Sequence, residues 1–193
     1  MSSTNKTDNI LLNQYVPTDK LEMADYNADM NLIDAAVKAN QDAIATSQDD
    51  ITTLESRPSC RVYKTAMQSI PSATDVVLTF DIELFDTGDM HSNSVNNDRI
   101  TIVEPGIYLI VGHVGYVINS SGYRAASIRK NGVAECQVTS PATTEYTLLN
   151  PSALIKCVAG DYLQLITSQN SGGALNVIGQ NYTCSFSAVK VAN

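Results

Sequence analysis

A seven-residue repeat between residues 26 and 54 constrains this chain more than any other feature. Apolar side chains recur there at alternating spacings of four and three, over about four repeats. Each repeat has two core positions. Met30, Val37, Ile44 and Ile51 occupy the first, and Tyr26, Ile33, Asn40, Ser47 and Leu54 occupy the second. This pattern predicts an α-helical coiled coil, because so narrow an apolar stripe needs identical helices beside it. A helix packed on its own domain is the alternative.

Local signals predict where this helix begins and ends. Asp19, with Glu22 three residues later, matches a capping box and predicts a helix start near Lys20. Pro58 predicts the end, since proline lacks an N–H donor and disfavours helical geometry in the residue before it. We therefore expect three parts: an N-terminal segment at residues 1–19, a coiled-coil stem at 20–57 and a head at 58–193.

After Pro58 the pattern changes to short β-rich runs separated by turns. The expected strands are 61–64, 76–80, 100–103, 107–116, 123–129, 133–138, 144–149, 153–157, 162–167 and 182–191. Asn131-Gly132 predicts a type I′ hairpin, because both residues tolerate positive φ. About ten short strands of this kind predict an all-β head, either a sandwich or a jelly roll.

The charge balance excludes several classes of partner. The chain carries 12 Lys and Arg against 20 Asp and Glu, a net charge of −8 that repels polyanions. Nucleic-acid binding is therefore not expected. The N-terminal sequence lacks the pattern of a signal peptide, and the most apolar stretch, 107–118, is short and interrupted by glycine. We expect synthesis in a cytoplasm and no membrane insertion.

Residues 98–110, DRITIVEPGIYLI, resemble the signature of the complement component 1q globular-head family, a branch of the tumour-necrosis-factor-like jelly rolls. The matching residues are Thr101, Pro105, Gly106 and Tyr108. The likeness continues in the family's order through 127–132, 159–165 and 184–189, and covers roughly residues 60–192. It implies a jelly-roll head that assembles as a tight homotrimer around a threefold axis.

A second resemblance lies near the N-terminus. Residues 14–19, QYVPTD, and 24–36, ADYNADMNLIDAA, are similar to the start of many phage tail-fibre and baseplate-appendage proteins. This likeness implies that residues 1–19 attach to another structural protein of a bacteriophage virion. Together the two resemblances imply a virion fibre, assembled in the host cytoplasm. Its trimeric head is expected to adhere to a host surface polysaccharide or protein, with glycans as the ligands that the family implies.

Three other functions stay open at this point. The chain could be a capsid head fibre or decoration protein, or a non-viral bacterial surface or spore-associated protein with the same head. An enzyme such as a small depolymerase or esterase is the third, although we do not expect one. The sequence contains no G-x-S-x-G elbow and no Cys with an evident His partner. A carboxylate pair for glycoside hydrolysis would be spatial rather than sequential.

The sequence assigns no catalytic, cofactor-binding or metal-binding residue. The polar stretch 87–98 is expected to be an exposed, solvated loop, with calcium ligation by Asp86, Asp89, His91 and Asp98 as the alternative. His113 lies in an apolar run and is expected to be packed and hydrogen-bonded. Buried free thiols are expected at Cys60, Cys136, Cys157 and Cys184. The candidate contact loops are 85–98, 119–123 and 169–174.

Overall fold

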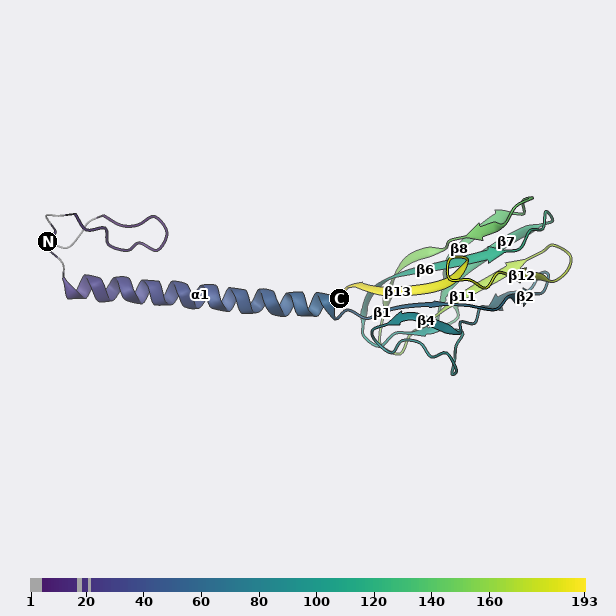
Figure 1. Ribbon diagram of the computed structural model, residues 1–193, viewed down its shortest axis with the longest axis horizontal. Helices are drawn as coiled ribbons and strands as arrows, with labels where there is room; N and C mark the ends of the chain where they lie inside the picture. The colour runs from purple at the N-terminus through teal and green to yellow at the C-terminus, as the bar shows by residue number, and fades with distance from the viewer. Residues whose placement is uncertain (1–4, 17–18, 21) are drawn as a thin grey trace. The chain divides into compact units, whose positions relative to one another are not determined.

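The computed structural model describes residues 5–16, 19–20 and 22–193. The chain divides into two compact units, Met1–Glu55 and Ser56–Asn193, which we describe separately. The first contains one long helix and the second contains all thirteen strands (Figure 1). No helix in the described part of the chain has the length and apolar character needed to cross a membrane.

The predicted helix is present as α1, Met23–Glu55, 33 residues long. It begins three residues beyond the predicted start, so Glu22 rather than Asp19 precedes it. The Asp19 carboxylate instead accepts a hydrogen bond from the backbone N–H of Val16, at 3.0 Å. None of the 33 residues of α1, all of which are described, is buried.

The N-terminal segment forms a small hairpin that the sequence did not predict. Its two arms, within residues 5–14, are joined by backbone hydrogen bonds of 2.9 Å from Thr7 to Leu12 and from Gln14 to Asn5. The backbone and side-chain amides of Asn13 donate to the Asp29 carboxylate of α1 at 3.0 and 2.8 Å. We call residues 5–14 the N-terminal hairpin; these bonds hold it against the helix.

The head is a sandwich of two antiparallel sheets. The large sheet has the order β2-β12-β6-β13-β1-β4, with β9 and β10 also paired to β6, and the small sheet has the order β3-β11-β7-β8, with β5 paired to β11. The large sheet comprises β1 Ser59–Tyr63, β2 Gln68–Ile70, β4 Ile82–Asp86, β6 Gly106–Tyr116, β9 Thr147–Leu149, β10 Ser152–Cys157, β12 Leu175–Val177 and β13 Cys184–Ala192. The small sheet comprises β3 Val76–Val77, β5 Ile100–Thr101, β7 Tyr123–Lys130, β8 Val133–Pro141 and β11 Tyr162–Gln169. The predicted all-β fold is confirmed.

Three strands, β2, β4 and β12, were not predicted. The expected strand at 76–80 is a strand only at Val76–Val77, although Leu78 and Phe80 beyond it are fully buried. The Asn131-Gly132 hairpin is confirmed between β7 and β8, with φ values of +52° and +82°. The seven other predicted strands are present with shifted ends.

The core lies between the two sheets, and β1 and most of β6 alternate between buried and more exposed residues, whereas β7 and β11 each bury five consecutive residues. On β6, Tyr108, Ile110, Val114 and Tyr116 all point inward and are at most 1% exposed. Phe186 of β13 stacks on Phe80, with ring centroids 5.9 Å apart. The hydroxyls of the two core tyrosines are hydrogen-bonded, that of Tyr116 to Thr167 Oγ1 and that of Tyr108 to the Glu104 carbonyl, both at 2.8 Å. The head therefore carries a complete core of its own.

The register also defines the two ends of the head. Ser59, where β1 begins, pairs with Val189 near the end of β13, and Val189 pairs with Leu109 near the start of β6. We call this end the base. The opposite end, where β6 finishes at Tyr116, is the apex. Figure 1 shows β1 and β13 side by side, with the C-terminus at the base.

Candidate functional site

The outward side of the large sheet is unusually apolar. One row of paired residues crosses it from Leu154 through Leu109 to Val189, with 68%, 37% and 37% of each side chain exposed. Two further rows lie beside it, nearer the apex. They consist of Ser152, Val111, Ser187, Arg61 and Phe85, and of His113, Ser185, Tyr63 and Ile82. We call these three rows the outer face.

Charge is scarce on the outer face. Arg61 is its only Lys, Arg, Asp or Glu, and its guanidinium donates to the backbone carbonyl of Asn181 at 3.3 Å. His113 Nδ1 lies 2.8 Å from Asn150 Oδ1, so the predicted hydrogen bond at this histidine is present. Within the described chain, the buried hydroxyl of Ser185 has no hydrogen-bond partner. A broad apolar face of this kind is suited to contact with another protein surface.

Two of the three predicted contact loops meet at the apex. The backbone N–H of Tyr123 donates to Asn170 Oδ1 at 2.6 Å, and the Asn170 N–H donates back to the Tyr123 carbonyl at 3.3 Å. Gly122 makes this approach possible, because a Cβ atom there would lie 2.2 Å from Asn170 Oδ1. Residues 119–123 and 169–174 therefore form one continuous loop surface.

Two fully buried polar side chains support this surface from below. The Arg124 guanidinium donates to the carbonyls of Asn119, Ser121 and Tyr123 at 2.9 to 3.0 Å. It lies over the Tyr116 ring, 5.5 Å from its centroid, and its partners in the described chain are all uncharged. The Gln169 amide donates to the carbonyls of Ile70 and Gly173 at 2.9 and 2.8 Å. These bonds hold the apex loops in a preformed arrangement.

The third predicted contact loop, 85–98, which contains the polar stretch 87–98, lies apart from the other two. Its start is tied to the base, because the Thr87 N–H donates to the Ser59 carbonyl at 2.9 Å. Its expected solvent exposure is wrong in part. Met90 is 1% exposed and the His91 side chain is fully buried, whereas Asn93 to Asn96 are exposed.

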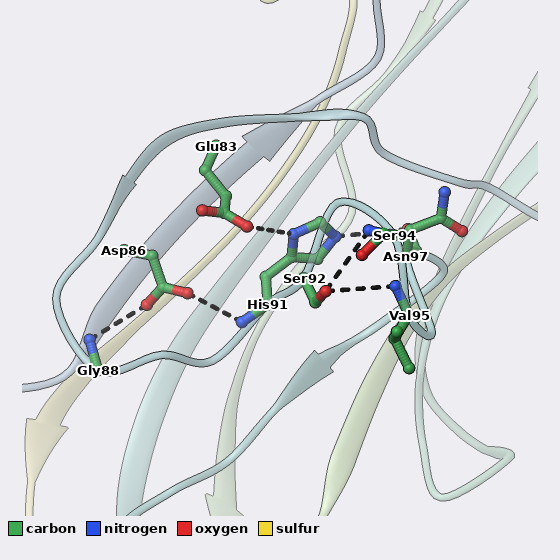
Figure 2. Close-up of polar contacts among 8 residues, drawn as sticks. All are labelled: Glu83, Asp86, Gly88, His91, Ser92, Ser94, Val95 and Asn97. Carbon is green, nitrogen blue, oxygen red and sulfur yellow. Dashed lines mark hydrogen bonds and ion pairs between the residues drawn. The ribbon is translucent and has the colours of Figure 1, made fainter.

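Figure 2 shows how two carboxylates of β4, Glu83 and Asp86, bind the start of this loop. Asp86 accepts the backbone N–H groups of Gly88 and His91 at 3.1 and 2.9 Å. His91 Nδ1 lies 3.1 Å from Glu83 Oε1, and its Nε2 lies 3.4 Å from the Asn97 carbonyl. The Asp86 and Glu83 carboxylates of β4 therefore hold the first residues of the loop in place.

The alternative of calcium ligation is not supported by this geometry. Asp98 is paired with Arg99 at 3.0 Å and accepts the Gln164 amide at 2.7 Å. Burial opposes ionisation of Asp98, but these hydrogen bonds outweigh it and lower the pKa of its carboxyl. Among residues 5–16, 19–20 and 22–193, no three His, Cys, Asp or Glu side chains gather as a metal site would require.

All four cysteines are free thiols, and the predicted burial is found at three of them but not at Cys136. Cys60, Cys157 and Cys184 are buried, and Cys136 is half-buried. Burial raises the pKa of the Cys184 thiol to about 12, which keeps it protonated and unreactive at neutral pH. The two histidines are engaged with Glu83 and Asn150 rather than with a Ser hydroxyl or Cys thiol.

The nine predicted stem residues lie along α1, and all are exposed on the single chain except Ile33, which is half-buried. Tyr26, Met30, Val37, Ile44, Ile51 and Leu54 each expose between 45% and 58% of their surface. The N-terminal hairpin approaches part of this stripe and leaves a cavity of about 570 Å³ between itself and the helix. Ile10 and Leu12 of the hairpin line this cavity, opposite Ile33 and Val37.

Comparison with known proteins supports the fold of the head. No family model matches the sequence. The solved structure of murine APRIL matches with a TM-score of 0.57 at 11% identity, covering 70% of this chain and 99% of that one. The globular domain of the zebrafish complement 1qA protein matches with a TM-score of 0.50 at 16% identity, with the same coverage. The head has the tumour-necrosis-factor-like, complement 1q-like jelly-roll fold.

The curated relative is viral. An uncharacterized protein of Acanthamoeba polyphaga mimivirus is 28% identical over 148 residues, which cover 70% of this chain. The matched region spans only 62% of the mimivirus protein. A relative of this chain is thus encoded by a virus.

Proposed function

We propose that this chain is a fibre subunit of a bacteriophage virion, and that its trimeric head adheres to the host cell surface. The observation that carries the proposal is the outer face, an apolar surface left open on a head that already has a complete core. Exposed apolar side chains that gather on one face mark sites of association, and this face gathers Leu154, Leu109, Val189, Ile82 and Phe85. The viral relative and the likeness of the N-terminal sequence to phage appendage proteins support placement in a virion.

Self-association would cover both open apolar surfaces at once. The outer face and the stripe of α1 belong to different units, and each leaves apolar side chains exposed in the described part of the chain, although the N-terminal hairpin approaches the stripe near Ile33. In a closed ring of identical subunits every copy buries such a face against its neighbour, and no copy is left with the face exposed. The number of copies rests on the resemblance to jelly-roll heads that assemble as trimers.

Adhesion is assigned to the apex. Its loops are held by internal hydrogen bonds, so little conformational entropy is lost when a ligand binds. Three linked heads would convert weak single contacts into useful avidity. We assign the head no catalytic role, because its histidines are engaged with carboxylate and amide groups. Residues 1–19 are proposed to attach the fibre to another virion protein.

Light scattering of the full chain tests the assembly. We expect wild type to have three times the mass of one chain. Leu109→Asp places a charge in the outer face, so its mass should be lower than that of wild type. Val133→Asp is the matched control, because Val133 is 66% exposed on the β7–β8 hairpin, away from this face. A monomeric wild-type protein, or equal effects of the two variants, would contradict the proposed trimer.

Two further measurements test the placement and the adhesion. Immunogold labelling of purified particles should mark the tail, whereas a label on the capsid would assign the chain as a head fibre or decoration protein instead. An unlabelled particle would favour a non-viral surface protein. Full-length protein should also sediment with host cells, and failure to do so would remove the adhesive role.

A further inference from the structure

The apex carries a groove next to the outer face, because its residue Leu148 pairs with Gly115, one row beyond His113 on β6. It has a volume of about 550 Å³, within the range of small-molecule sites. Its walls come from the connection between β12 and β13 and from the chain around the start of β9. The lining residues are Met67, Val117, Tyr146, Leu148, Ile178, Gln180, Tyr182 and Thr183.

The floor and one wall of the groove are fixed by hydrogen bonds and close packing. The Ile178 N–H donates to the Gly115 carbonyl at 2.8 Å, which joins this wall to the end of β6. The Thr183 hydroxyl lies 3.3 Å from the carbonyls of both Ile178 and Gln180. Gly179 is so close to the preceding loop that a Cβ atom would lie 2.5 Å from the backbone of Ala66. The groove is therefore preformed.

The chemistry of the lining restricts what can bind. Tyr146 and Tyr182 are 58% and 70% exposed. None of the described residues that line the groove is charged, so it offers nothing to neutralise a phosphate, a carboxylate or an ammonium group. The exposed Gln180 amide and the two tyrosine hydroxyls provide hydrogen-bonding groups beside apolar surface.

We propose that this groove binds a pyranose ring of a neutral polysaccharide. One face of such a ring presents C–H groups that pack on a tyrosine ring, and its edge presents hydroxyls that an amide can bind. The inference rests on the proposed adhesive function and names its ligand class. A single shallow contact of this type is weak, and three copies in one trimer would supply the avidity.

Saturation-transfer NMR on the full-length protein tests the groove directly. The probes are the methyl glycosides of glucose, galactose and N-acetylglucosamine, with the methyl glycoside of sialic acid as an anionic comparison. We expect transfer to the ring C–H protons of at least one neutral probe and none to the sialoside. Tyr146→Ala and Tyr182→Ala should each weaken that binding by about tenfold, the usual scale for one lost aromatic contact.

Tyr123→Ala is the matched control, since Tyr123 is 41% exposed at the apex but does not line the groove. Its binding should equal that of wild type. Absence of transfer to every neutral probe, or an equal loss in Tyr123→Ala, would overturn the inference. A drop in mass of Tyr182→Ala by light scattering would also overturn it and make the groove an interface between copies.

The cell-sedimentation assay separates this inference from the function on which it rests. If Tyr146→Ala and Tyr182→Ala sediment with host cells as well as wild type does, adhesion stands and the groove is not its site. If wild type itself does not sediment, the adhesive function fails. A neutral glycoside that binds the groove in that case would still identify a sugar site.

Discussion

The helix and the head use apolar residues in opposite ways. In the head, two facing sheets enclose the apolar side chains in a shared interior, and Tyr108, Ile110 and Phe186 are fully buried. In α1 the apolar residues recur regularly, yet none is buried. The difference shows that periodicity specifies which face needs a partner, whereas the topology decides whether the same chain can provide it.

The sharpest test of this contrast is a cavity in the head. Phe186→Ala removes one of two stacked rings from the core and should lower the free energy of unfolding by about 3–5 kcal/mol. Urea denaturation of the full chain, followed by near-ultraviolet circular dichroism, measures this. Val158→Ala, at a residue that is 58% exposed, should change the midpoint little. A loss below about 1 kcal/mol for Phe186→Ala would mean that the head is not stabilised by this core.

A charge in the helix stripe should act on assembly rather than on folding of the head. Ile44→Asp removes burial worth about 2 kcal/mol per chain in an assembled stem and brings like charges together. We expect the helix content to fall at low protein concentration, measured by far-ultraviolet circular dichroism, while the head transition keeps its midpoint. Thr46→Asp, outside the stripe, should leave both unchanged. If the helix content of Ile44→Asp depended on protein concentration as that of wild type does, the heptad register would be wrong.

High pH should destabilise the head but not the helix. Burial raises the pKa of Cys184 from 9.0 to about 12 and that of Tyr116 from 10.0 to about 12. The unfolded chain releases these protons first, so the stabilisation is complete below about pH 9 and is lost as the pH rises towards 12. Each group contributes about 1.4 kcal/mol per pH unit within its window. Urea midpoints at pH 8, 9 and 10 measure this. Above pH 9 the midpoint should fall less steeply with pH in Cys184→Ala than in wild type.

The smallest expected effect concerns the N-terminal hairpin. Asn13→Ala removes the side-chain bond to Asp29 and should loosen residues 5–14, at a cost of about 1 kcal/mol or less. Hydrogen exchange should become faster at Thr7 and Gln14, whose N–H groups join the two arms. Asn9→Ala, at the exposed turn, is the control. Unchanged exchange in Asn13→Ala would mean that the hairpin does not depend on its contact with α1.

Sequence reasoning was reliable where a strand is long. The strands β6, β7 and β11 were found because each is a run of eight residues or more with turn residues beside it, such as Pro105-Gly106 and Asn131-Gly132. The strands β2 and β12 have three residues each, too few to display a period. In β4, IELFD leaves Ile82, Leu84 and Phe85 all exposed, so no buried face could be recognised.

The candidate surfaces depend on contacts that local sequence does not encode. Residues 119–123 and 169–174 meet because β7 pairs with β11, and that pairing joins segments about fifty residues apart. The groove likewise brings Tyr146 and Tyr182 together from separate connections. The polar stretch 87–98 contains two apolar residues, Met90 and Val95, and the sequence alone does not tell that Met90 is buried whereas Val95 is 66% exposed.

The shared position of β1 and β13 at the base has a consequence for how this protein can diversify. The first and last strands of the head both reach the base, so every connection at the apex is a loop that joins two strands. A peptide inserted between Thr143 and Thr144, which are exposed, would lengthen the loop between β8 and β9 without displacing a strand of either sheet. The apex can thus exchange its recognition loops over evolutionary time, or accept a grafted epitope in the laboratory, while the base keeps the chain path unchanged.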